Sequence, residues 1–343
     1  RWPNLNKKVS DKPGTVQILY TFNTSNDCGE ILLTTFNSQS IENRLTSIML
    51  FTSGLIGVFA FLQVYTIQAV LPLVIKQLHA SVLQAGNAVG ASVLAVALMS
   101  PFLGLISDYF GRKILIVGSV IFIAIPTILM AYAQSIQSLT LLRFFQGLGV
   151  PGITVVAIAY IGEEFSGKNI TSMLSAYVSG SIVGGFLGRF IFGYLCGWLD
   201  WNHAFLVMGI TNIIGGFLIW YLLPSSQAFI PTKSVLSSLR IIPIHLKNNS
   251  IIFACLLGMS VLFTLVGSFT YITVHLEGNP FNYSLSQLSN IFSVYLIGFI
   301  ITPIASRIIQ IYGSRKTIIC ALSLTLIGLL LTLNMHIVLI ILG

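Results

Sequence analysis

The segment GLISDYFGRK, residues 104–113, joins two long apolar runs of the chain. The runs at residues 83–106 and 114–132 are each long enough to cross a lipid bilayer as a helix, which takes about 17–25 residues. Between them the segment carries an acid and two adjacent basic residues. A short polar turn between two apolar helices is typical of a membrane protein.

The composition extends this interpretation to the whole chain. Only 8% of its 343 residues are charged, 55% are apolar, and the mean hydropathy is +0.91. A soluble domain carries about 25% charged residues. These values exclude a disordered chain, argue against a soluble enzyme and indicate lipid as the solvent.

Nine apolar runs of spanning or near-spanning length follow residue 45, and a tenth begins near Ile337. The nine cover residues 47–74, 83–106, 114–132, 139–161, 171–195, 205–223, 251–274, 288–304 and 317–333. Backbone groups in lipid must be paired within their own segment, so each run is expected to be a helix. The strands of a barrel would instead alternate in polarity, and these runs do not. The expected fold is therefore an all-α membrane protein.

The charges divide the chain further. Residues 1–45 are polar, lack the apolar core of a signal peptide and are expected to form a cytoplasmic or disordered tail. Residues 224–250 are rich in proline and basic residues, as expected for a cytoplasmic linker between an N-terminal six-helix bundle at 46–223 and a second bundle at 251–343. The second bundle is incomplete, so we expect a C-terminally truncated chain.

Basic residues also predict the orientation. The gaps between successive runs must lie alternately on the two sides of the membrane. Apart from the tail, this places ten basic residues on one side and only Lys76 on the other. The ten are Arg44, Arg112, Lys113, Lys168, Lys233, Arg240, Lys247, Arg307, Arg315 and Lys316. The positive-inside rule then predicts a cytoplasmic N-terminus.

An internal repeat supports the division into halves. The second run is followed by YFGRK at 109–113 and the eighth by IYGSRK at 311–316, with their glycines 202 residues apart. Six helices per repeat is the arrangement of transporters built from two parallel halves.

Segment 104–113 resembles the loop 2–3 signature of the major facilitator superfamily, Gly-x-Leu-Ala-Asp-Arg-x-Gly-Arg-Lys. The matching residues are Gly104, Asp108, Gly111, Arg112 and Lys113. The departures are Ile106, Ser107 and Tyr109. The resemblance implies a cytoplasmic gate in which Asp108 pairs with Arg112; the alternative is an ordinary basic loop.

The same gate is expected to include acids from the fourth run. Glu163 and Glu164 end this run on the cytoplasmic side, and related transporters bond a glutamate here to the loop arginine. Arg315, in the second copy of the loop, is assigned to the gate as well. The alternative for the acids is a solvated helix end.

A second motif, Arg143-x-x-Gln146-Gly-x-Gly, resembles a superfamily signature whose arginine is implicated in coupling in proton-coupled members. Arg143 and Gln146 are three residues apart and therefore share one helix face. The expected role is in the transport pathway. The alternative is an arginine whose side chain extends to the outer interface.

The fifth run carries GSIVGGFLGR at 180–189. Gly180, Gly184 and Gly188 form a smooth ridge on which another helix can pack closely. The segment is similar to a signature of drug/proton antiporters, although Gly185 stands at the proline position and Arg189 replaces the last glycine. It fits better with a bacterial branch of exporters, and Arg189 is predicted to line the pathway.

In the fold of the major facilitator superfamily, which the resemblance implies, helices 1, 4, 7 and 10 line the central transport cavity. The first run adds Tyr65 and Gln68 to the expected pathway, and aromatic residues such as Phe269 and Tyr295 lie in runs seven and eight. Amides and aromatic rings suit a neutral or amphipathic organic ligand. For each residue alone, packing or contact with lipid is the alternative.

No P-loop, HExxH or GxSxG motif and no pair of histidines at metal-ligand spacing occurs in the sequence. We therefore expect no enzyme, metal or cofactor, and any transport to be secondary. The resemblance implies alternating access for a small organic solute, in the export direction, across a bacterial inner membrane. Protons are a candidate coupling ion, although no carboxylate lies within a run. The expected partners are solute and lipid, without nucleic acid, for a monomer. A polytopic receptor, a membrane-embedded enzyme and an inactive fragment are the alternatives.

Overall fold

The computed structural model describes residues 6–12, 15–24, 27–32, 38–226, 247–333 and 336–342. It divides into two compact units, Arg1–Thr52 and Ser53–Gly343. The linker predicted at 224–250 lies for the most part outside the described residues.

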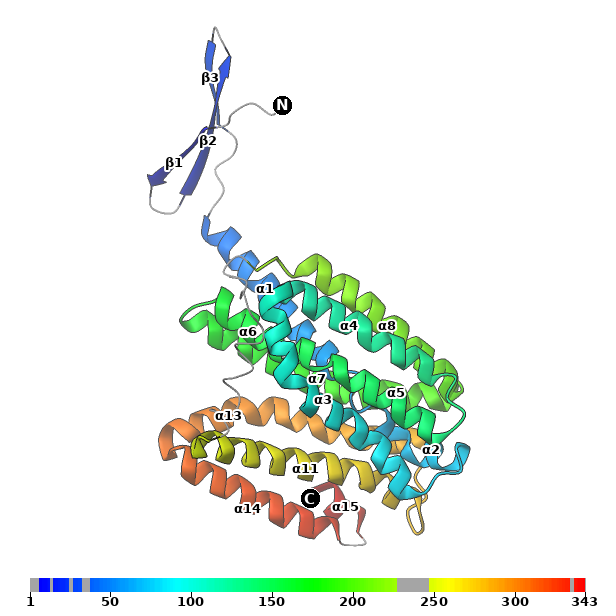
Figure 1. Cartoon of the computed structure of the whole chain (residues 1–343). Coiled ribbons are helices and arrows are strands. Elements are labelled where there is room, and N and C mark those ends of the chain that lie inside the picture. Colours follow the sequence, from blue (N-terminus) through cyan, green and yellow to red (C-terminus); the bar gives the residue numbers. More distant parts are fainter. Residues whose placement is uncertain are drawn as a thin grey trace. The chain divides into compact units, whose positions relative to one another are not determined.

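The first unit contains a small antiparallel sheet within residues 1–45, which were expected to form a cytoplasmic or disordered tail (Figure 1). Strands β1 (Asn6–Lys12), β2 (Thr15–Thr24) and β3 (Asp27–Leu32) pair in sequence order. In β2 the apolar residues at 16, 18, 20 and 22 follow the two-residue period of a strand. The helix α1 (Ser38–Phe61) begins in this unit and continues into the second.

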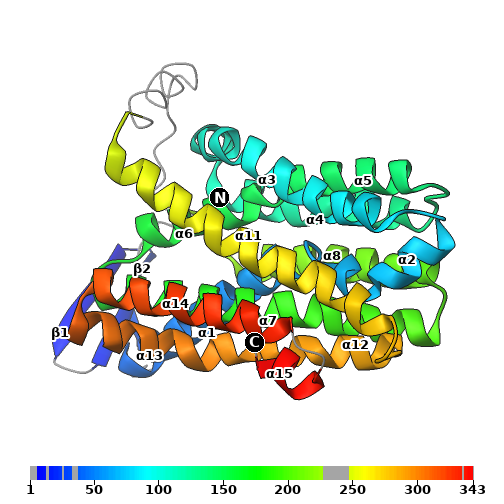
Figure 2. The same cartoon turned by 90° about the horizontal axis from the view of Figure 1, so that it is seen from below.

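The second unit consists of helices that run side by side along a common direction (Figures 1 and 2). After α1, its first half contains the 3₁₀ helix η1 (Thr66–Val70), α2 (Leu71–Gln77), α3 (Val82–Phe110), α4 (Arg112–Met130), α5 (Ile136–Gly149), α6 (Pro151–Glu164), α7 (Lys168–Trp198) and α8 (Trp201–Leu222). Its second half contains α11 (Asn249–Glu277), α12 (Leu285–Ile291), the 3₁₀ helix η2 (Phe292–Leu296), α13 (Ile297–Tyr312), α14 (Ser314–Thr332) and α15 (Ile337–Leu342). Each predicted apolar run falls on one or more of these helices, and the all-α fold is confirmed for the membrane-spanning part.

Among the described residues, seven helices are long and apolar enough to span a membrane, or eight if the bent first pair is counted. That pair, Thr46–Phe61 and Thr66–Gln77, is bent by 49°. The eighth predicted run corresponds to α12, η2 and α13, whose continuous apolar part, Leu285–Ile301, is shorter. The count of nine complete spans therefore stays a prediction.

Two of the predicted runs contain a 3₁₀ helix. η1 lies in the first run and η2 in the eighth, so these interruptions lie in different halves. A 3₁₀ stretch within a longer helix often marks a functional position because its backbone groups are less well paired.

The backbone turns in the same way at the two copies of the predicted repeat. Gly111, between α3 and α4, has φ +94°, and Gly313, between α13 and α14, has φ +81°. Both angles lie in the region that only glycine adopts without strain. The two halves thus turn in the same way before their basic residues.

The glycine ridge of α7 packs on α1. A Cβ atom on Gly180, Gly184 or Gly188 would lie within 1.9–2.2 Å of a carbonyl oxygen of α1 or the residue after it. Those oxygens belong to Gly54, Val58 and Leu62. The spacing of four residues on both helices shows that their backbones touch along one face, as close-packed membrane helices do.

Candidate functional site

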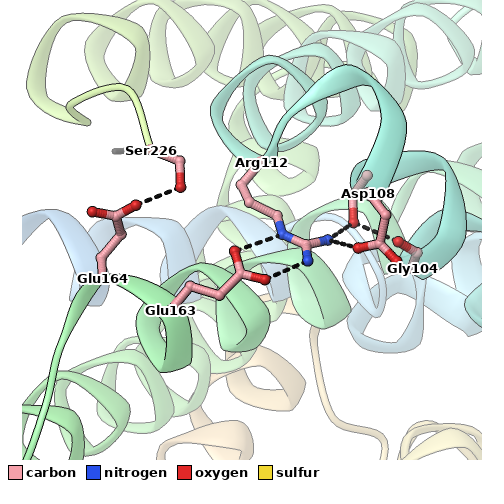
Figure 3. A network of polar contacts seen from close by, with 7 residues as sticks. Gly104, Asp108, Arg112, Glu163, Glu164 and Ser226 are labelled. Carbon is pink, nitrogen blue, oxygen red and sulfur yellow. Dashed lines mark hydrogen bonds and ion pairs between the residues drawn. The ribbon is translucent and has the colours of Figure 1, made fainter. Parts of the chain in front are cut away.

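Arg112 is the centre of a cluster of charges at one end of the first half (Figure 3). Its Nη2 and Nε donate to the two carboxylate oxygens of Glu163 at 2.6 and 3.0 Å. Its Nη1 pairs with Asp108 Oδ1 at 2.6 Å and donates to the hydroxyl of Ser107. The Arg112 side chain is only 8% exposed, so these charge-assisted bonds are largely shielded from water.

Local chain geometry explains the cluster. Asp108 is in the last turn of α3, Gly111 makes the turn, and Arg112 is the first residue of α4. Glu163 comes from the end of α6. The cluster therefore joins three helix ends that all belong to the first half.

The remaining residues predicted for the gate lie elsewhere. Glu164 turns the other way and accepts a hydrogen bond from Ser226 (Figure 3). The Lys113 ammonium lies 4.9 Å from the ring centre of Trp220 on α8. Arg315 is exposed on α14. The structure thus brings Asp108, Arg112 and Glu163 together, but leaves Lys113 and Arg315 outside their cluster.

Gly104, the first residue of the predicted loop signature, lies on α3 where that helix passes α6. A Cβ atom on Gly104 would lie 3.7 Å from the side chain of Val155, which is an ordinary van der Waals distance. Close approach of the two helices therefore does not by itself require glycine at this position.

Arg143 on α5 is fully buried, and both of its Nη groups are bonded to neighbours from the first half, while its Nε has no hydrogen-bond partner in the described residues. Its two Nη groups donate to the carbonyl oxygens of Gln63 and Val64, the amide oxygen of Gln146 and the hydroxyl of Ser92. Gln146 in turn donates to Thr127 at 2.7 Å. Because it is buried, Arg143 does not extend to an aqueous interface as the alternative required.

Arg189 on α7 is fully buried as well, but its surroundings differ. Its Nε donates to Gln68 Oε1 at 2.8 Å, and its Nη1 donates to the Gly185 carbonyl at 2.6 Å. Four aromatic rings surround the guanidinium, with ring centres 4.6–5.5 Å from its carbon. They belong to Tyr65, Tyr295, Phe292 and Phe269. We call Arg189, Gln68 and these four residues the Arg189 cage.

The cage is built by both halves of the unit. Gln68 lies in η1 of the first half and also donates to Thr270 Oγ1 on α11 at 2.8 Å. Phe292 and Tyr295 lie in η2 of the second half. Both 3₁₀ interruptions therefore meet at Arg189.

The cage brings together three residues predicted for the pathway, namely Tyr65, Gln68 and Arg189. The other two, Arg143 and Gln146, belong to the neighbouring cluster. The two clusters are linked by residues 63–68, which contact both arginines. Sequence reasoning missed Ser92 and Phe292, because a lone serine or phenylalanine in an apolar run carries no distinguishing signal. No group of three or more potential metal ligands occurs in the part of the chain described here.

The two halves also contact each other at the ends of the helices that lie far from Arg112. Lys76 at the end of α2 forms an ion pair with Glu277 at the end of α11. Tyr194 on α7 donates to Asn290 Oδ1 on α12 at 2.9 Å. Together with the bond from Gln68 to Thr270, these contacts close the halves on the side of Lys76, which the charge pattern predicts to be outside.

Reversing the charge of Lys76 is expected to have a small effect. The Lys76 side chain is 69% exposed, and exposed ion pairs contribute about 0.2–1 kcal/mol. We expect K76E to change the initial transport rate of the reconstituted protein by no more than about fivefold, and K76E/E277K to restore it. A tenfold loss that the double variant fails to restore would contradict this role.

Comparison with known proteins agrees with this architecture. The profile described as Major Facilitator Superfamily matches residues 54–333. An uncharacterized transporter of Buchnera aphidicola from Schizaphis graminum is 30% identical over 288 residues, covering 84% of this chain and 70% of that protein. The chloramphenicol resistance protein CraA of Acinetobacter baumannii is 24% identical over 249 residues, covering 70% and 58%.

A solved structure has the same fold. The bacterial homolog of the human lysosomal transporter Spinster, in an inward-facing, unoccupied conformation, aligns with a TM-score of 0.63 at 19% identity. The alignment covers 79% of this chain and 64% of that one, so the chain spans less than two thirds of its length. The family profile covers most of the helices and both clusters of buried arginine contacts, and the chain belongs to the major facilitator superfamily.

Proposed function

We propose that this protein moves a small organic solute across a membrane by alternating access. The observation that carries the proposal is the Arg189 cage, a buried polar site built by both halves of the unit. A site at the interface of two repeats, formed where helices are interrupted, is the arrangement through which two halves can expose a ligand to either side.

The contacts between the halves support a particular step of this cycle. The described bonds of Lys76, Tyr194 and Gln68 join the halves on the predicted outer side. On the opposite side, the described bonds of Arg112 go to Glu163, Asp108 and Ser107, which belong to the first half. The contacts between the halves on the outer side support an inward-facing arrangement.

Export is the direction we propose, in a bacterial inner membrane with the N-terminus in the cytoplasm. The similarity to a protein named for chloramphenicol resistance supports export. Proton coupling is a separate expectation from the resemblance, because every acid of the chain either precedes the first apolar run or lies at a helix end.

The test is solute movement by the complete protein in liposomes. We expect chloramphenicol or another solute from a panel of small organic compounds to cross protein-containing liposomes faster than empty ones, with saturation. Imposing a pH gradient of one unit should drive net movement against a concentration gradient if protons are coupled. The gradient should have no effect on the rate if they are not.

A control separates transport from leak. Liposomes containing protein with the R189Q substitution should show the permeability of empty liposomes for every solute that the unaltered protein moves. Equal fluxes for the unaltered protein, R189Q and empty liposomes across the whole panel would contradict transport.

A further inference from the structure

The membrane-spanning part of this chain has an unbalanced charge. Arg143 and Arg189 lie within the spans, whereas all nine carboxylates precede the first apolar run or lie at helix ends. These acids are Asp11, Asp27, Glu30, Glu42, Asp108, Glu163, Glu164, Asp200 and Glu277. A buried charge without a partner is costly, so two positive charges in this region call for an explanation.

Backbone and side-chain oxygens pair both Nη groups of Arg143, and of its nitrogens only Nε has no hydrogen-bond partner in the described residues. Four acceptors receive its two Nη groups, and all of them belong to the first half. This arrangement does not require the second half and would persist while the halves move. Arg143 is therefore held within its own bundle.

Arg189 is not satisfied in the same way. Only its Nε and Nη1 have acceptors, and its Nη2 is buried with no hydrogen-bond partner in the described residues. The four rings stabilise the cation through their faces, because each centre lies within about 6 Å of it. They supply no acceptor to Nη2, which retains two unused N–H groups.

Gly185 allows the cage to pack closely on the backbone of α7. A Cβ atom there would lie 3.1 Å from the Tyr295 ring and 3.4 Å from Arg189 Nη1. A larger residue would therefore press on both groups.

We propose that Arg189 binds an organic anion, namely a carboxylate attached to a flat apolar body. This inference rests on the proposed transport function and narrows its substrate class. The carboxylate would accept from Nη2 and balance the charge of Arg189. The apolar body would lie against rings from both halves, so that binding depends on η1 and η2 together.

Benzoate and benzamide form a matched pair of probes. They have nearly the same shape, but only benzoate is an anion at pH 7. With the purified complete protein in detergent, we expect saturating benzoate to raise the melting temperature by roughly 2–5 °C and benzamide by less than 1 °C. Sodium chloride at the same ionic strength is the control for a general effect of salt or of an inorganic anion. These measurements use the unaltered protein.

Two variants then locate the site. R189Q should abolish the benzoate shift, and R189K, which keeps the charge without the planar fork, should reduce it. R307Q removes an exposed arginine on α13 and should leave the shift unchanged. If R189Q fails to fold, Y295A provides a second readout, because loss of a cage ring should weaken benzoate binding at least about threefold.

The outcomes separate the substrate class from the proposed function. A benzoate shift that depends on Arg189 supports the inference. Equal shifts with benzoate and benzamide, or with benzoate and chloride, would overturn it. If the protein transports a neutral solute while benzoate neither binds nor competes, the inference fails and the transport function stands. If benzoate binds through Arg189 but no solute moves, the site stands and the transport function fails.

Discussion

The R112A variant is expected to reduce the initial transport rate at least tenfold. Arg112 makes two bonds to Glu163 and one ion pair with Asp108 while almost buried. Hydrogen bonds to charged groups contribute about 1.5–3 kcal/mol, and 1.4 kcal/mol corresponds to a factor of ten. Removing the guanidinium leaves two partly shielded carboxylates facing each other, so the ends of α3, α4 and α6 lose their mutual orientation.

The rate has to be compared with the amount and the melting temperature of folded protein. R112K keeps the charge but loses the two-pronged bond to Glu163, and we expect an intermediate rate. R307A removes an exposed arginine on α13 and should keep at least half of the unaltered rate. A normal rate for R112A would exclude the gate role of the cluster. A fall in melting temperature that matches the fall in rate would assign Arg112 to stability alone.

The second large effect is expected for G184A. The added Cβ would lie 2.2 Å from the carbonyl oxygen of Val58, so α7 and α1 would have to move apart. Overpacking of this kind costs about 1–3 kcal/mol or more, which corresponds to a melting temperature lower by roughly 2–10 °C. Because Arg189 is on the same helix, a shift of α7 would also disturb its bond to Gln68.

G118A is the matched control. Gly118 is exposed on α4, and its added Cβ would meet no atom within 4 Å. Alanine is favoured over glycine within a helix by roughly 0.5–1 kcal/mol, so its melting temperature should stay the same or rise. The comparison is made by thermal unfolding in one detergent. Equal melting temperatures for G184A and G118A would show that the two helix backbones do not touch.

Much of the membrane fold could be predicted because it depends on single segments. Each apolar run is long enough to span a bilayer and must form its own hydrogen bonds, so its helical state follows from composition and length. The strands β1 to β3 could not be predicted in this way. Their segment is polar, and the two-residue period is confined to the few apolar residues of β2, so segment hydropathy gives no signal there.

The site could be predicted only in part. The contact of Arg143 with Gln146 follows from a spacing of three residues in a helix, and that of Asp108 with Arg112 from their nearness in the chain. The bond between Arg112 and Glu163 was expected only through the resemblance to a family. No local pattern indicated that η1 and η2 would surround Arg189.

The lipid solvent, the helical class of the membrane part and the repeat follow from hydropathy, segment length and recurring residues, which are properties of the chain read in order. That Arg143 is enclosed by one half while Arg189 lies between both is seen only in the packed helices. That distinction depends on contacts such as the one between Gln68 and Thr270, which lie 202 residues apart. Residues so distant meet only when packed helices bring them together, and the unpaired Nη2 of Arg189 becomes visible only after all those neighbours are in place.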